Sequence, residues 1–183
     1  MFLNQKTNFT TTSRMKVGIV SDTHEDLSEE ISTIIENCDI AIHAGDIGTS
    51  LVLESLQPKT GHVIAVAGNN DKPYLWDFKD WQLVKNLPHV LKLSLPGGQL
   101  VVEHGHEHDM FKPDHQDLRA AHPQARAIVY GHTHIQVIDD NESQCVLNPG
   151  AAGFTRNKGG PSCIVLTIDN DVWNYEVFKF EDN

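Results

Sequence analysis

The sequence predicts a single α/β domain in which two packed β-sheets are flanked by helices. The chain has 183 residues, of which 39% are hydrophobic, so it is long enough to close one core and short for two. Strand-like and helix-like segments alternate in its first half, which is typical of a parallel sheet. Short strand-like runs follow at hairpin spacing, which favours an antiparallel or mixed second sheet. We expect residues 15–183 to form this domain and residues 1–14 to be a flexible N-terminal extension.

Three short apolar segments predict the parallel strands, at residues 16–21, 39–44 and 62–67. After the first of them, Asp26 and Glu29 have the spacing of a capping box, and apolar residues follow at helical intervals, so we expect a helix to begin there. A shorter helical stretch spans residues 49–56. The order strand, helix, strand, helix, strand requires crossover connections, and these make the three strands parallel.

Seven further strand-like runs lie in the second half, at residues 90–95, 100–104, 127–130, 135–138, 145–147, 163–168 and 172–180. Pro96, Gly97 and Gly98 separate the first two and predict a hairpin. A helix is predicted over residues 114–121, before Pro123. An earlier segment holds four aromatic residues, for which core packing is favoured over a lid above a site: Tyr74, Trp76, Phe78 and Trp81.

The composition excludes several classes of protein. Only 14 Lys and Arg face 25 Asp and Glu, so no general excess of positive charge can hold a nucleic-acid backbone, and we expect no stable nucleic-acid complex. The three cysteines form no C-x-x-C pair, which argues against a disulfide framework and a thiolate zinc site. No apolar run reaches the roughly 20 residues of a membrane-spanning helix, so we expect no membrane association and a cytoplasmic location.

Seven polar residues follow predicted strands, at the point where each strand ends. The carboxyl ends of such strands form one edge of a sheet, so side chains far apart in the chain can converge there on one site. The set comprises two carboxylates, one amide and four imidazoles: Asp22, His24, Asp46, Asn69, His104, His132 and His134. Mixed oxygen and nitrogen donors suit manganese, iron or zinc, whereas calcium and magnesium favour oxygen alone. The sequence therefore predicts a transition-metal site.

Two pairs in this set, Asp22 with His24 and His132 with His134, are separated by one residue. In extended backbone, such a spacing directs both side chains to the same side. Each residue also has a structural alternative, since a single Asp is more often a helix cap or turn residue and a single His a polar strand end. The joint order of the motifs is much harder to obtain by chance than any one of them.

Five blocks carry this order: D-T-H at residues 22–24, G-D at 45–46, G-N-N-D at 68–71, H-G-H at 104–106 and G-H-T-H at 131–134, followed by an N-P-G turn at 148–150. Together they resemble the signature of the calcineurin-like metallophosphoesterases, in particular the small bacterial and archaeal phosphodiesterase branch. The resemblance covers nearly the whole chain, from residue 15 to about residue 179.

The resemblance implies a four-layer sandwich of helices, two mixed β-sheets and helices, which agrees with the strand pattern. It also implies two divalent metal ions per chain, manganese first, with iron, zinc, nickel or magnesium as alternatives. The implied ligands are Asp22, His24 and His134 for the first ion, Asn69, His104 and His132 for the second, and Asp46 for both.

The residues that the resemblance places at the reaction centre are Asn69, Asn70, Asp71 and His104. Larger members of the family carry a histidine where this chain has Asn70. An amide donates a hydrogen bond but supplies no proton at neutral pH, which favours esters with good leaving groups. Asp71 is expected to orient a ligand or its loop. We leave the role of His106 open and expect His108 to be exposed.

The implied activity is that of a dinuclear phosphodiesterase that hydrolyses small or nucleotide-like phosphate esters with a metal-bridging hydroxide. Alternatives are a phosphomonoesterase or protein phosphatase, and a catalytically silent metal-binding scaffold of the same fold, such as the retromer subunit. A scaffold is disfavoured because none of the seven ligands is replaced, and a protein phosphatase because the short chain has few insertions to build a peptide groove. The partner is then a small phosphate-ester substrate, and a homodimer is one alternative for the assembly.

Overall fold

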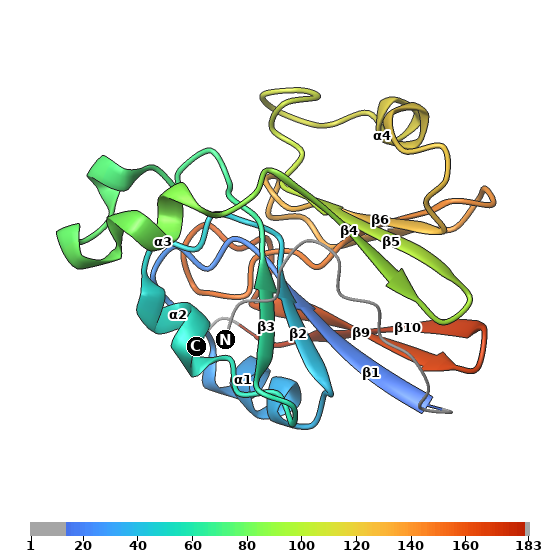
Figure 1. Ribbon diagram of the computed structural model, residues 1–183, viewed down its shortest axis with the longest axis horizontal. Coiled ribbons are helices and arrows are strands. Elements are labelled where there is room, and N and C mark those ends of the chain that lie inside the picture. Colours follow the sequence, from blue (N-terminus) through green and yellow to red (C-terminus); the bar gives the residue numbers. More distant parts are fainter. Residues whose placement is uncertain (1–13, 182–183) are drawn as a thin grey trace.

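The computed structural model describes residues 14–181 and arranges them as two five-stranded sheets packed face to face (Figure 1). The first sheet has the order β10-β9-β1-β2-β3. Its strands are β1 (Arg14–Val20), β2 (Ile40–His43), β3 (His62–Ala65), β9 (Ser162–Asp169) and β10 (Val172–Lys179). Strands β1, β2 and β3 are parallel, as the sequence predicts, whereas β9 runs antiparallel to both β1 and β10. This sheet is therefore mixed.

The second sheet has the order β4-β5-β6-β8-β7. Its strands are β4 (Val90–Leu95), β5 (Gly98–Glu103), β6 (Ala127–Val129), β7 (Val137–Asp139) and β8 (Cys145–Asn148). Strands β4 and β5 form the predicted hairpin, with Leu95 opposite Gly98. Strands β5, β6 and β8 are parallel, and β7 runs antiparallel to β8. The prediction of two mixed sheets is confirmed.

The main core lies between the two sheets. Ile19 and Ile42 of the first sheet and Val102 and Leu147 of the second are fully buried in one hydrophobic cluster. The β-branched side chains suit this position because they pack well on a pleated surface. Removal of this apolar area from water is the main driving force that holds the sheets together.

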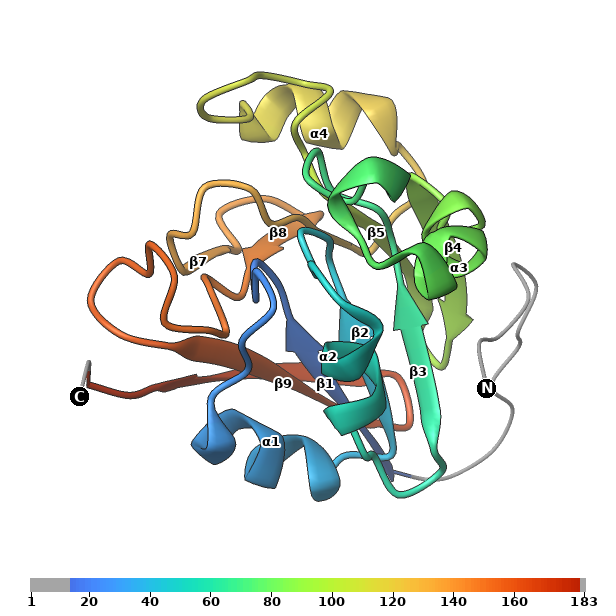
Figure 2. The same ribbon diagram turned by 90° about the vertical axis from the view of Figure 1, so that its left-hand side faces the viewer.

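Helices cover the outer faces and complete four layers (Figure 2). Helices α1 (Glu29–Glu36), α2 (Ser50–Ser55) and α3 (Trp81–Lys85) contribute to the cluster on the outer face of the first sheet. Helix α4 (His115–Ala121) places Leu118 against Val101 and Ile128 on the outer face of the second sheet. Asp114 caps α4 by accepting a hydrogen bond from the Gln116 amide. The order of layers is helices, sheet, sheet, helix.

Two local predictions are wrong. Helix α1 begins after Ser28 and not at Asp26, because the Asp26 amide donates to the carbonyl of Thr23 and belongs to the preceding turn. The Ser28 hydroxyl donates to the carboxylate of Glu30 at 2.6 Å instead of capping a backbone amide. Strand β7 begins at Val137, two residues later than predicted, because residues 133–136 belong to the loop after β6.

The aromatic segment divides between core and surface. It folds as two short 3-10 turns, η1 (Pro73–Leu75) and η2 (Phe78–Asp80), which lead into α3. Trp76 is buried, and its carbonyl accepts a hydrogen bond from the indole of Trp81. Tyr74 and Phe78 are 71% and 81% exposed, so the expectation of core packing is wrong for them. Both residues belong to these short 3-10 turns, which bury none of their side chains.

Of the predicted extension, only Arg14 lies within the described residues, where it pairs with Asp169 as the first residue of β1. Cys38, Cys145 and Cys163 are buried and free. Over residues 14–181, no helix is both long and apolar enough to cross a membrane.

Replacement of Ile42 by Ala tests the core between the sheets. We expect the free energy of unfolding to fall by about 2–5 kcal/mol, because the change leaves a cavity at a fully buried position. Urea denaturation followed by circular dichroism measures the loss. Leu51→Ala, at a position 60% exposed, is the matched control and should change stability by less than about 0.5 kcal/mol. Equal losses in the two variants would contradict the packing described.

Candidate metal centre

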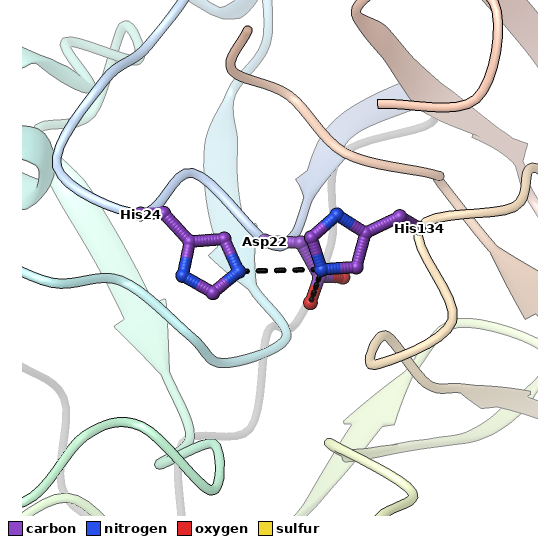
Figure 3. Close-up of side chains that lie close together, drawn as sticks. All are labelled: Asp22, His24 and His134. Atoms are coloured by element: carbon purple, nitrogen blue, oxygen red, sulfur yellow. Dashed lines mark hydrogen bonds and ion pairs between the residues drawn. The ribbon is translucent and has the colours of Figure 1, made fainter. Parts of the chain in front are cut away.

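The loops after β1 and β6 bring three of the predicted ligands together, although they come from different sheets. The Nε2 atoms of His24 and His134 lie 3.2 Å apart, and Nε2 of His134 lies 3.4 Å from Oδ1 of Asp22 (Figure 3). One donor atom from each of these residues lies within 4.8 Å of the others. Asp22 is fully buried and His134 nearly so. This trio is the set of ligands that the resemblance assigns to the first ion.

Asp46 connects this trio to a second group. Its Oδ2 atom lies 3.6 Å from Nε2 of His24, and its Oδ1 atom lies 3.4 Å from Nε2 of His104. Nε2 of His104 is also 3.9 Å from Oδ1 of Asp22. The two oxygens of Asp46 therefore face histidines of different groups, which is the arrangement that a bridging carboxylate requires.

His132 and Asn69 complete the second group. Their Nδ1 and Oδ1 atoms are 3.0 Å apart, and the His132 ring lies 5.3 Å from that of His104. Nε2 of His132 donates to the carbonyl of Met110 at 2.7 Å, because a carbonyl can only accept. Nδ1 is then the ring nitrogen that His132 presents to the oxygen of Asn69. All seven predicted ligands thus lie in one continuous cluster.

The cluster contains donor atoms that need a cation. Nδ1 of His104 donates to the carbonyl of Ala44 at 2.8 Å, whereas its buried Nε2 has no aligned hydrogen-bond partner. That Nε2 faces the carboxylates of Asp46 and Asp22, just as Nδ1 of His132 faces an amide oxygen. Carboxylates and imidazoles this close together need a positive charge between them. A proton on His104 can supply it in the metal-free protein, and a metal ion can take its place, so these residues fit metal ions.

The backbone at these positions corrects one sequence inference. Five ligands have left-handed backbone with φ between 47° and 68°: Asp22, His24, Asp46, His132 and His134. The paired ligands at 22–24 and 132–134 are therefore not in extended strands, and a tight turn directs them to one side. Such φ values cost non-glycine residues about 1 kcal/mol or more each and concentrate at functional sites.

Two glycines permit the close approach of these loops. A Cβ on Gly68 would lie 2.2 Å from Oδ1 of Asp46, and a Cβ on Gly131 would lie 2.0 Å from Oγ of Ser21 and 2.8 Å from Oδ2 of Asp22. Real Cβ atoms do not occur at such distances, so any side chain at either position would displace a carboxylate ligand.

Neither Asn70 nor Asp71 contacts an imidazole through a hydrogen bond. The backbone amide and side-chain amide of Asn70 donate to the two oxygens of Asp46, at 2.8 and 2.7 Å. The Asp71 carboxylate accepts from the amides of Gly68 and Ile47 and so holds two ligand-bearing loops together. Asn70 thus orients Asp46. Of the two roles expected for Asp71, its contacts agree with orientation of the loop and not with orientation of a ligand side chain.

Sequence reasoning missed His43, to which it gave no role. Nδ1 of this buried side chain accepts from the Gly45 amide, and Nε2 lies 2.9 Å from the hydroxyl of Thr23, which donates to the carbonyl of Ile47. His43 therefore links the loops after β1 and β2. Burial lowers its pKa to about 3, so it remains neutral. The only signal was a histidine at the end of an otherwise apolar strand.

The buried carboxylates and imidazoles perturb one another strongly. Burial raises the pKa of Asp22 to about 7. Burial lowers the pKa of His104, but the carboxylates of Asp46 and Asp22 outweigh it and raise the value to about 9. For Asp46, burial raises the pKa, and His104 together with Asn70 outweighs this and holds the value well below its usual range. The centre therefore favours a positive charge between its carboxylates.

Comparison with known proteins identifies the family. Residues 15–171 match the calcineurin-like phosphoesterase superfamily domain. The chain belongs to this superfamily. It is 32% identical over 166 residues to the probable metallophosphoesterase YsnB of Bacillus subtilis, which covers 86% of each chain. It is 27% identical over 146 residues to the phosphodiesterase MJ0936 of Methanocaldococcus jannaschii, over 74% of this chain and 83% of that protein.

Comparison with solved structures confirms the fold. A Vps29 structure from Entamoeba histolytica superimposes with a TM-score of 0.70 at 17% sequence identity and covers 91% of this chain and all of the other. The family assignment and the α/β architecture predicted from the sequence are confirmed, as is the class of metal-dependent phosphoric ester hydrolase at the level of the family.

Protein stripped of metal ions by a chelator should lose stability as the pH rises from about 7 to about 9. The folded state holds the His104 proton up to about pH 9, whereas an unfolded histidine loses its proton near pH ~6.5. Stability from this group is therefore complete below the unfolded pKa and is lost as pH rises through the folded pKa. Thermal unfolding at both pH values measures the loss, which we expect to be on the order of 2 kcal/mol.

His104→Gln is the control for this pH dependence, because its side chain does not titrate. Its unfolding temperature should change much less between the two pH values than that of the unaltered chain. An identical slope in both proteins would show that His104 is not the group that holds the proton.

Proposed function

We propose that this chain is a dinuclear metal-dependent phosphodiesterase that hydrolyses small or nucleotide-like phosphate esters. The observation that carries the proposal is the convergence of two carboxylates, four imidazoles and an amide from the ends of both sheets. Oδ2 of Asp46 faces His24 and its Oδ1 faces His104, which supports Asp46 as the carboxylate common to two adjacent sets of donors. The mixed oxygen and nitrogen donors suit manganese, iron or zinc, and the resemblance to the family places manganese first.

Two divalent ions held by these ligands would stabilise negative charge on the phosphoryl group and lower the pKa of water to about 7, which would supply a nucleophile near neutral pH. The side chains of this protein set where that chemistry takes place. Asn70 fixes both oxygens of Asp46, and the Ala44 carbonyl fixes the ring of His104. Hydrogen bonds of this kind to ligands hold an imidazole in one tautomer and orientation. The ligand frame is thus built before a substrate arrives.

A hollow beside His24 and Asn70 supports a small substrate. It has a volume of about 220 Å³ and is also lined by Trp76 and Arg156. Pockets for drug-sized ligands are usually larger, at roughly 300–1,000 Å³. Nη2 of Arg156 lies 2.9 Å from Nε2 of His24, so a guanidinium reaches the edge of the centre. Such a group binds phosphate oxygens through paired hydrogen bonds.

The amide of Asn70 favours esters whose leaving group departs without a proton. Its side chain is committed to Asp46, and an amide has no proton to supply near neutral pH. We therefore expect aryl diesters to be better substrates than alkyl diesters. A catalytically silent scaffold is disfavoured, because none of the seven ligands is replaced in this chain.

The Asp46→Asn variant tests the proposal directly. Loss of the shared carboxylate should lower the metal content and reduce kcat/KM on bis(4-nitrophenyl) phosphate with manganese by about 100-fold or more. Metal analysis by mass spectrometry and a colorimetric assay give the two measurements. Asp140→Asn changes an exposed carboxylate and serves as the matched control.

Two results would contradict the proposal. One is an unaltered protein that stays inactive on this diester when manganese is supplied. The other is an Asp46→Asn variant that keeps the metal content and the activity of the control. Higher activity on 4-nitrophenyl phosphate than on the diester would favour the phosphomonoesterase alternative instead.

Arg156→Ala should raise KM more than it lowers kcat, because a guanidinium at the rim contributes to substrate binding and not to the ligand set. We expect an increase in KM of about 10-fold, in line with the loss of a charged hydrogen bond. Lys158→Ala removes an exposed cation two residues further along the same loop and should leave KM unchanged. Equal KM values for both variants would exclude Arg156 from substrate binding.

A further inference from the structure

A second cluster of metal-ligand side chains lies outside the centre described above. Oε1 of Glu103 is 2.7 Å from Nε2 of His108, and Oε2 of Glu103 is 2.9 Å from Nε2 of His122. One donor atom from each of the three residues lies within 4.8 Å of the others. A single carboxylate is therefore held between two imidazoles that come from different parts of the chain.

The topology separates this cluster from the first centre. Glu103 is the last residue of β5, and the side chains of neighbouring residues in a strand point to opposite faces. Along β5, Val102 packs into the core between the sheets, whereas Val101 packs beneath α4. Glu103 follows the face of Val101, and His104 follows the face of Val102 toward the first centre. The second cluster thus lies on the outer face of the sheet.

The other two members come from the loop and helix that cover this face. His122 is the C-cap residue of α4, and Gln144 holds it by donating to its carbonyl at 2.7 Å. His108 lies in the loop between β5 and α4, where its amide donates to the carbonyl of Gly105. In Figure 1, this loop rises from the end of β5 and returns beside α4. The three ligands therefore come from a strand, a loop and a helix end.

The burial and unpaired atoms of the cluster point to a ligand. The side chains of Glu103 and His122 are only 7% and 8% exposed. Oε2 of Glu103 accepts a hydrogen bond from Nε2 of His122, whereas Oε1 contacts Nε2 of His108 at 2.7 Å without an aligned hydrogen bond. A buried carboxylate oxygen without a hydrogen bond is costly unless a cation contacts it. His108 is 20% exposed and provides a route from solvent.

We propose that Glu103, His108 and His122 form a zinc site with the two Nε2 atoms and the Glu103 carboxylate as ligands. Two imidazoles and one carboxylate form a donor set that zinc takes with tetrahedral geometry, and solvent fills the fourth position. The proposal does not rest on the phosphodiesterase function, because none of its ligands belongs to the first centre.

A zinc ion at this site would fix the loop that supports the first centre. The loop between β5 and α4 carries Met110, whose carbonyl accepts the hydrogen bond from Nε2 of His132. This contact sets the tautomer of His132, so its Nδ1 is the atom left for a metal ion. Zinc bound by Glu103, His108 and His122 joins the base of the loop to α4 and thereby holds this support in place.

Zinc binding can be measured in an Asp46→Asn background, in which the first centre is weakened. We expect the zinc content of this protein to fall by one ion per chain when Glu103→Gln or His108→Gln is added. Removal of a direct ligand should weaken zinc binding by more than the roughly 10–100-fold that loss of a ligand's hydrogen-bond partner causes. Cobalt supplies a second readout, since tetrahedral cobalt gives visible absorption bands that should disappear with the same substitutions.

Glu107→Gln is the matched control, since it removes an exposed carboxylate from the same loop, and its zinc content and cobalt bands should equal those of the background. If Glu103→Gln does not fold, the partly exposed His108→Gln decides alone. The proposal is overturned if folded His108→Gln protein keeps the zinc stoichiometry and cobalt spectrum of the background. Activity of the unaltered chain with manganese reports separately on the first centre, so failure of one proposal is distinguishable from failure of the other.

Discussion

The architecture depends on one constraint: carboxylates and imidazoles must be buried close together between the loops of the two sheets. Asp22 and Asp46 are both removed from water, and burial of unpaired carboxylates is costly. The structure offsets this cost with nearby imidazoles and with the amide donors of Asn70. The left-handed backbone of five ligands and the absence of a Cβ at Gly68 and Gly131 follow from the same need, since the donors can approach one another only through tight turns.

Much of this could be predicted from the sequence because it depends on local patterns. The apolar runs marked the strands, and the polar residues after them marked the site, since strand ends that share an edge bring their loops together. The family's blocks then supplied the ligand sets. The same features fixed the class of fold, because alternating strands and helices followed by hairpins leave few arrangements in which all apolar faces are covered.

What could not be predicted depends on tertiary contacts. Asp26 has the right spacing for a capping box, but the competing turn with Thr23 moves the start of α1 to Glu29. Residues with the spacing of Asp22 and His24 can direct their side chains to one side both in an extended strand and in a left-handed turn. The spacing therefore does not reveal which backbone conformation is present. The role of His43 comes from its contacts with Thr23 in the loop after β1 and with Gly45 in the loop after β2. A periodic pattern contains no information about such neighbours.

Because the first centre lies at the junction of the two sheets, the protein can lose activity without losing its fold. The ligands before residue 70 lie in loops of one sheet, and those after residue 100 lie in loops of the other. The distances between the two groups therefore depend on how the sheets pack against each other. A small sliding of one layer changes every distance across the junction while each layer keeps its own hydrogen bonds. Substitutions deep in the interface would therefore impair turnover in molecules that still look native by spectroscopy.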